Sequence, residues 1–186
     1  MKLRMVVSLL AFLSLFGAAA RAQETPKVDI FAGYSYVREN PSTSGPSGFS
    51  LNGGSASLTY HVKDWISGVA DFGAYHNGNI LGSGVDGTLS TYLFGPRVSH
   101  RSYKRVTPFG EALFGVAHAG ASFLGTSTSQ NAFAMALGGG VDYRLNNRFS
   151  LRPVQLDYLI TRFPVGTTGN QTQNNLRVST GILLHF

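Results

Sequence analysis

The sequence contains no cysteine. This excludes disulfides, thiolate metal ligands and cysteine nucleophiles. Beyond residue 19 it also lacks a long apolar run, because Gly, Asn, Ser or a charged residue interrupts every apolar stretch within a few positions. None of these stretches approaches the roughly 20 residues that a transmembrane helix requires. Charged residues make up only 13% of the chain, and they form no basic cluster interleaved with aromatic residues, which argues against a nucleic-acid reader.

The beginning of the chain has the pattern of an export signal. A basic start and an apolar run over residues 5–19 are followed by small residues around position 21. We expect cleavage after residue 22, which makes residues 1–22 a signal peptide and 23–186 the mature domain. A retained anchor helix is the alternative, but the apolar run is too short to span a bilayer. Without the three basic residues of the signal, 12 basic and 9 acidic residues remain, a net charge of +3 instead of +6.

Apolar side chains in the mature part recur at every second position, as in strands with one apolar face. The clearest example is the last segment, where Leu176, Val178 and Ile182 share one face and Arg177 and His185 lie on the other. Three consecutive glycines at 138–140 predict a close approach or a bend within a strand. The alternation predicts eight strands, at residues 27–38, 51–62, 65–76, 88–99, 106–118, 132–144, 150–162 and 174–186.

The connections between these strands are expected to alternate in length. The long ones are rich in Gly, Ser, Thr, Asn and Pro, and they fall at 39–50, 77–87, 119–131 and 163–173. The short ones carry most of the basic residues, namely Lys63, Arg101, Lys104, Arg105, Arg144 and Arg148. A meander of strands with two unlike ends follows from this asymmetry.

The charged residues of the strands define which face is enclosed. Six of them fall opposite the large apolar side chains, where a water-soluble barrel would have its dry core; they are Asp71, Arg97, Glu111, Asp142, Asp157 and Arg177. In hydrocarbon every backbone N–H and C=O must be paired, so strands cross a membrane only as a closed barrel. We therefore predict an all-β fold, an eight-stranded antiparallel up-and-down transmembrane β-barrel with its polar face inside.

Several segments resemble a known family. YLFGPRV at 92–98, TPFGEALFGVA at 107–117 and RPVQLDYL at 152–159 are similar to segments of small eight-stranded barrels in the outer membrane protein A and X and opacity-protein superfamily. The last strand, with Ile182, Leu184 and Phe186 on one face, resembles the terminal strand that the outer-membrane assembly machinery recognises. The resemblance implies a bacterial outer-membrane location and contact with outer-membrane lipid and lipopolysaccharide.

The enclosed charges are the candidate site. An unpaired charge in a low-dielectric interior costs several kcal/mol, so these residues should pair into a polar network. We expect Arg97 to pair with Glu111 and with Asp71 or Asp142, and Arg177 to pair with Asp157. Such a network would plug the lumen and leave the protein a structural or surface-interaction role. A narrow pore for small solutes is the alternative.

A lipid A-modifying enzyme is a further alternative, because some small outer-membrane barrels use a His and a Ser near the outer rim. His76, His118 and Ser122 fall near the predicted outer end. Catalysis requires a base within hydrogen-bond reach of a hydroxyl, and His118 shares the lipid-facing parity of Phe114. We therefore expect no enzymatic activity, no cofactor and no metal. We also expect a monomer that binds no nucleic acid, and the sequence identifies no ligand for the long loops.

Overall fold

The computed structural model describes residues 26–40, 48–82, 85–101, 105–123, 126–165 and 169–186. The predicted signal peptide, residues 1–22, lies outside this part. The strands are β1 (Val28–Glu39), β2 (Phe49–Lys63), β3 (Ile66–Asn77), β4 (Asp86–Ser99), β5 (Val106–Phe123), β6 (Thr126–Arg144), β7 (Phe149–Val165) and β8 (Gly169–His185), and a short 3-10 helix, η2 (Ile80–Gly82), precedes β4. No helix in the described part is long and apolar enough to cross a membrane.

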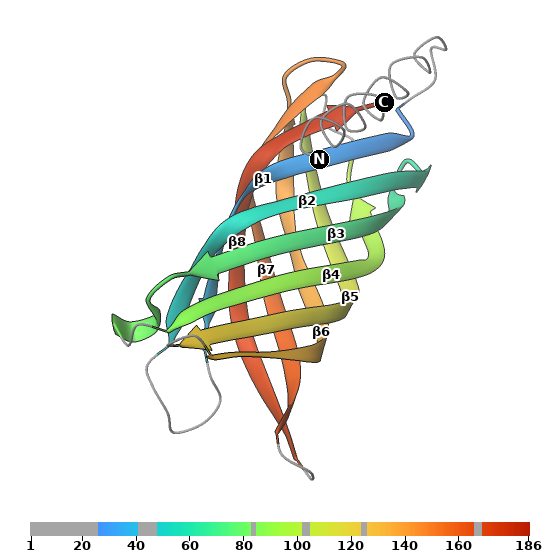
Figure 1. Cartoon of the computed structure of the whole chain (residues 1–186). Coiled ribbons are helices and arrows are strands. Elements are labelled where there is room, and N and C mark those ends of the chain that lie inside the picture. Colours follow the sequence, from blue (N-terminus) through green and yellow to red (C-terminus); the bar gives the residue numbers. More distant parts are fainter. Residues whose placement is uncertain (1–25, 41–47, 83–84, 102–104, 124–125, 166–168) are drawn as a thin grey trace, which may run out of the picture.

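The eight strands close on themselves. Each pairs antiparallel with its neighbours in sequence, and β1 pairs with β8 (Figure 1). At the seam, the Val28 N–H donates to the Phe186 carbonyl at 3.2 Å, and the Phe186 N–H donates to the Val28 carbonyl at 2.9 Å. The predicted eight-stranded up-and-down barrel is thereby confirmed.

The two ends of the barrel differ. The turn end holds the connections β2–β3, β4–β5 and β6–β7, and the loop end holds the other four. Two expected loops are wrong: 119–131 and 163–173 are mostly strand, because β5 pairs with β6 up to Phe123 opposite Thr126, and β7 pairs with β8 up to Val165 opposite Gly169. These extensions are polar, so apolar alternation does not mark them, although their backbone pairing continues.

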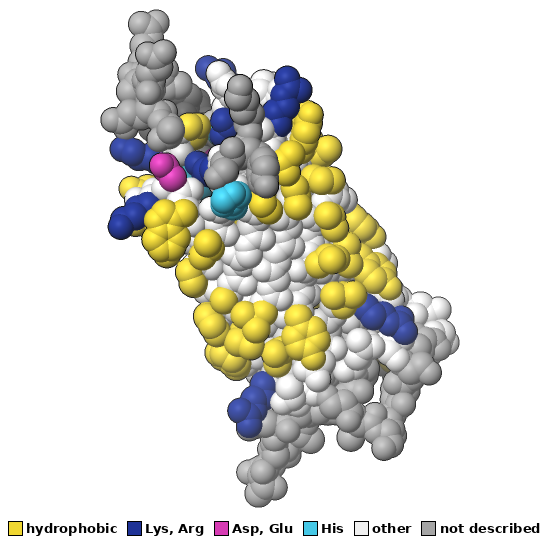
Figure 2. Space-filling view, turned by 180° about the vertical axis from the view of Figure 1, so that it is seen from behind, with side chains coloured by type: hydrophobic (Ala, Val, Ile, Leu, Met, Phe, Trp, Pro, Cys, Tyr) yellow, Lys and Arg dark blue, Asp and Glu magenta, His cyan; other side chains and the backbone are white. Residues whose placement is uncertain are grey.

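The outside of the barrel wall is apolar. Large side chains there are exposed, including Leu58, Phe94 and Leu156, the last with 50% of its surface open. Figure 2 shows hydrophobic side chains spread over this wall, with Lys and Arg side chains toward its two ends. Since contiguous apolar surface of this extent is not tolerated in water, the wall fits a hydrocarbon environment.

The inside of the barrel has two parts, of which the sequence pattern indicated one. Buried charged residues lie on the strand face that was expected to be enclosed, and most of them are nearer the turn end. The remainder of the interior is an apolar cluster that includes Val37, Leu51, Leu89, Leu93, Leu113 and Leu159. These large side chains have the same strand parity as the charges, so the enclosed face is polar in one part and apolar in the other.

The glycine run 138–140 allows the close approach that the sequence predicted. A Cβ atom at Gly138 would clash with Asp157 Oδ1 and with the Leu156 carbonyl oxygen. A Cβ atom at Gly139 would clash with the carbonyl oxygen of Phe109 on the neighbouring strand β5. The wall is therefore tight where β6 passes the charged interior, and only glycine leaves room for the Asp157 carboxylate.

The polarity of the wall leads to a prediction about Leu156, near the middle of β7. Leu156→Arg should lower the free energy of unfolding in phospholipid vesicles by about 2 to 4 kcal/mol, the cost of a cation at the bilayer midplane. Val62→Arg is the matched control, because Val62 is 64% exposed but lies beside Lys63 at the turn end; its cost should be about 0 to 1 kcal/mol. If chemical denaturation gave equal losses of unfolding free energy for Leu156→Arg and Val62→Arg, the wall would not span a membrane.

Candidate functional site in the barrel interior

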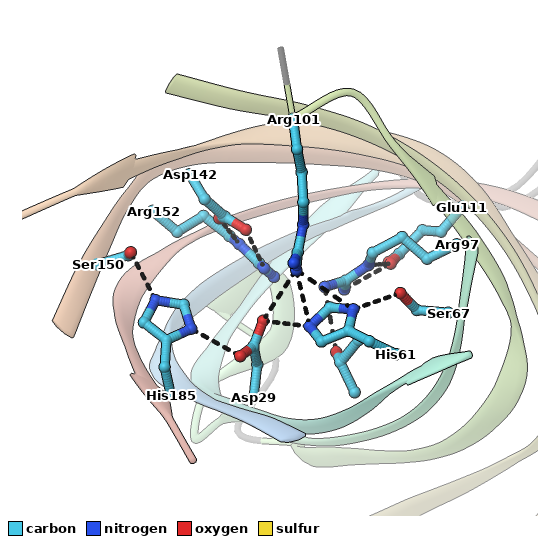
Figure 3. Close-up of polar contacts among 11 residues, drawn as sticks. Asp29, His61, Ser67, Arg97, Arg101, Glu111, Asp142, Ser150, Arg152 and His185 are labelled. Carbon is cyan, nitrogen blue, oxygen red and sulfur yellow. Dashed lines mark hydrogen bonds and ion pairs between the residues drawn. The ribbon is translucent and has the colours of Figure 1, made fainter. Parts of the chain in front are cut away.

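The enclosed charges form one connected group, which we call the lumen ion cluster. It comprises three arginines, four carboxylates and one amide: Arg97, Arg152, Arg177, Asp71, Glu111, Asp142, Asp157 and Gln155. These residues come from strands β3 to β8, so alternate positions on six strands converge in the lumen. Figure 3 shows two of its pairs, Arg97 with Glu111 and Arg152 with Asp142.

Arg97 joins β4 to β5. Its Nε lies 2.7 Å and its Nη2 2.6 Å from Glu111 Oε2. Nη1 donates to Thr59 Oγ1 on β2 at 3.2 Å, and the guanidinium lies 4.3 Å from the centre of the Phe109 ring. A desolvated cation against an aromatic face gains about 2 kcal/mol. Arg97 is therefore fixed by a charge, a hydroxyl and a ring at once.

Arg152 belongs to the cluster, although the alternation did not place it there. It has the parity of Val154, which lies outside, yet its own side chain is fully buried. The register between β7 and β8 shifts between Arg152 and Gln155, so this bulge reverses the face that Arg152 presents. Pro153, which donates no backbone hydrogen bond, was the sequence signal for this irregularity.

The contacts of Arg152 are extensive. It forms a two-pronged pair with Asp142, with Nε to Oδ1 at 2.7 Å and Nη2 to Oδ2 at 3.1 Å. Its guanidinium also lies 4.5 Å from the centre of the Phe31 ring and 4.4 Å from that of Phe109. Phe109 thus contacts two of the three arginines.

Arg177 on β8 pairs with two carboxylates. Its Nη1 lies 2.6 Å from Asp71 Oδ1 and its Nε 2.8 Å from Asp157 Oδ2. Nη1 also donates to the Tyr75 hydroxyl at 3.3 Å. Because the Arg177 side chain is fully buried, its charge is compensated by Asp157 on the neighbouring strand β7 and by Asp71 across the lumen.

Gln155 connects the separate pairs. Its Oε1 accepts from Arg152 Nη1 at 2.7 Å, and its Nε2 lies 2.9 Å from both Glu111 Oε1 and Asp157 Oδ2. One neutral amide therefore links all three arginine centres. The alternation placed Gln155 on the enclosed face, but it gave no sign of this bridging position.

The expected second partner of Arg97 is wrong. Arg97 contacts Glu111, as expected, but neither Asp71 nor Asp142. Asp71 pairs instead with Arg177, and Asp142 with Arg152. The reason is geometric. The bulge turns Arg152 of β7 toward Asp142, and Asp71 lies across the lumen from Arg177 of β8. The Arg177 pair with Asp157 is present between paired residues of β7 and β8.

A second group, which we call the turn-end cluster, contains Asp29, His61, Arg101 and His185 with Ser67 and Ser150. Figure 3 shows the Asp29 carboxylate between two imidazoles. Asp29 Oδ2 lies 2.7 Å from His61 Nε2, and Oδ1 lies 2.6 Å from His185 Nδ1. The cluster joins β1 to both of its neighbours. The described residues include no His, Asp and Glu group arranged to hold a metal ion.

The residues considered for catalysis are not brought together. His118 is exposed, and its Nδ1 contacts Asn131 Oδ1 at 2.7 Å. Ser122 lies four positions further along β5, roughly 13 Å away at the rise of a strand, and His76 is exposed on β3. Within the described part, no hydrogen bond joins any two of these three side chains.

The residues of the expected assembly signal lie on the outer wall at the turn end. Ile182 and Phe186 are each 51% exposed, and Leu184 is partly exposed. Ile182 pairs with Ala32 and Leu184 with Ile30 of β1. The same segment that carries the exposed apolar face therefore also closes the barrel.

A closed barrel with an apolar wall and ion pairs inside defines the class of integral outer-membrane β-barrels. The sequence matches the model of the outer membrane protein beta-barrel domain over residues 8–182. The chain belongs to that family, and the resemblance seen in its sequence is confirmed. Membership places the protein in the outer membrane. No curated protein matches the chain in sequence.

Solved structures share the fold. Neisserial surface protein A (NspA) has a TM-score of 0.71 at 15% identity, covering 86% of this chain and 97% of NspA. Ail, the attachment invasion locus protein of Yersinia pestis, has a TM-score of 0.57 at 17% identity, covering 86% and 99%. The N-terminal barrel domain of Pseudomonas aeruginosa OprF has a TM-score of 0.55 at 15% identity, covering 88% and 100%.

The double pairing of Arg177 predicts that its removal is costly. Arg177→Met leaves two carboxylates buried without their cation and should lower the free energy of unfolding by about 3 to 5 kcal/mol. Arg144→Met, at an exposed position of the turn end, is the control and should change it by less than about 0.5 kcal/mol. Equal, small losses in denaturant titrations of both variants would show that the buried pairs do not hold the interior together.

Proposed function

We propose that the protein is a non-enzymatic barrel of the outer membrane whose lumen is closed and whose loop end faces outward as a surface for interactions. The observation that carries this proposal is the lumen ion cluster. Three guanidinium groups converge on four carboxylates, two aromatic rings and Gln155, and they span the interior from β3 to β8. Eight strands leave a lumen just wide enough for side chains to fill.

The apolar cluster supports closure independently. Leu93, Leu113 and Leu159 are fully buried inside the barrel. They form a second barrier, because an ion that passed them would lose its hydration without gaining polar partners. A conducting path would need a gap through both layers.

The outward surface is formed by the loop-end connections and by the strand extensions that support them. The segments 40–48, 78–85, 124–125 and 166–168 contain no Lys or Arg. Ail was solved in complex with a heparin analogue, sucrose octasulfate. The composition of the loop end here does not favour capture of such a polyanion, so we propose an uncharged contact surface, exposed beside lipopolysaccharide.

Conductance separates a closed barrel from a narrow pore. In planar lipid bilayers the protein should give no steady single-channel steps, because both interior layers block ions. A narrow pore would give uniform steps whose size changes in Arg177→Met and stays constant in the exposed control Arg144→Met. Such steps would overturn the proposal of a closed lumen.

We also propose that residues 1–22 direct export and are removed, and that β8 serves as the recognition strand for the assembly machinery. Protein recovered from the outer membrane should begin at Gln23.

The recognition role of β8 is tested by substitution. Phe186→Ser should lower the amount of protein inserted into the outer membrane severalfold, whereas Val62→Ser, which is also on the outer wall but on β2, should not. A retained signal, or equal insertion of both variants, would contradict these two roles respectively.

A further inference from the structure

The loop end of the barrel contains a cavity that the closed-lumen proposal does not use. Its volume is about 350 Å³. It is bounded by the loop-end parts of β1, β2, β4 and β8, the 3-10 helix η2, and the extended hairpin of β5 and β6. For comparison, an apolar cavity of ~150 Å³ holds one benzene molecule. The space is therefore sufficient for a small organic molecule.

Most of the surface that lines this cavity is apolar, and the polar residues Thr88, Thr128, Ser129, Gln130 and Gln173 complete the lining. Phe49, Leu51, Ile80, Leu89 and Ala119 contribute side chains to it. Leu51 and Leu89 are also members of the buried apolar cluster. The inner side of the cavity is therefore formed by the part of that cluster that is nearest the loop end. Hydrophobic walls with few polar groups are typical of sites for small molecules.

One charged side chain interrupts this lining. Glu39, the last residue of β1, is only 4% exposed and lines the cavity. The Asn175 side chain donates a hydrogen bond to it, and Asn175 is itself fixed, because its Oδ1 accepts from the Asn40 N–H at 3.0 Å. Across the described residues, no cation lies within ion-pair distance of Glu39.

In the part of the chain that the structure describes, no cationic side chain reaches this position. The loop-end segments 40–48, 78–85, 124–125 and 166–168 contain no Lys, Arg or His. Arg38 and Arg162 are close in sequence to the loop end, but both side chains lie exposed on the outer wall. The buried carboxylate of Glu39 therefore stands apart from the lumen ion cluster, in which every arginine is matched with a carboxylate.

We propose that this cavity binds a small amphiphilic amine from the external side. The ammonium group would pair with Glu39 and the apolar body would lie against Leu51 and Leu89. Charge complementarity carries the choice of head group, because a buried carboxylate without a counter-ion is costly and a charge-assisted hydrogen bond relieves that cost. The size of the cavity fits a chain of medium length or a two-ring aromatic body.

Three probes of equal chain length test this: octylamine, octan-1-ol and octanoate. They are titrated into the mature protein in lipid nanodiscs, and the methyl resonances of Leu51 and Leu89 are followed by NMR. Octylamine should shift both saturably, with roughly tenfold higher affinity than octanol, and octanoate should not bind. The methyls of Val62 on the outer wall report partition into lipid and should not saturate in parallel.

Two variants complete the test. Glu39→Gln should weaken octylamine binding roughly tenfold while leaving octanol unchanged, and Ala119→Phe should abolish both by filling the cavity. Equal affinity for octylamine and octanol, or an unchanged response in Glu39→Gln, would overturn the assignment of an amine. Absence of saturable shifts with all three probes would overturn the site itself, and neither result would affect the conductance test of the closed lumen.

Discussion

The pairing of β1 with β8 closes the barrel, and both the apolar wall and the enclosed charges require this closure. Ten residues of β1, Asp29–Arg38, are opposite ten of β8, Leu176–His185, and this seam removes the last free edge of the sheet. Inside hydrocarbon an open edge would leave N–H and C=O groups without partners, at several kcal/mol each. The turn-end cluster reinforces the seam, because Asp29 contacts His185 across it and His61 on the other side.

Closure determines what the interior must contain. Once the apolar face is turned toward lipid, the other face of each strand is enclosed, and a charge there is costly unless it is paired. The lumen ion cluster meets this requirement with few groups, because Gln155 connects three pairs and Phe109 contacts two guanidiniums. Toward the loop end the interior becomes apolar, and it opens into the cavity beside Glu39.

The sequence alone predicted the strands and the enclosed face, because the two-residue period encodes both. It failed where backbone geometry departs from that period. Arg152 was missed because a bulge reverses its face, and the extensions of β5 to β8 were missed because strands outside lipid need no apolar alternation. Partners such as Asp71 and Arg177 could not be predicted either, since they are 106 positions apart and meet only across the closed lumen.

The closed barrel should be stable only while its outer wall is in an apolar medium. Heat-modifiable migration of the mature protein, folded in detergent, tests this most directly. The unboiled sample should run at a different position from the boiled one, because the sealed barrel stays compact in the gel. A single position in both lanes, with a monomer that remains soluble without detergent, would contradict it.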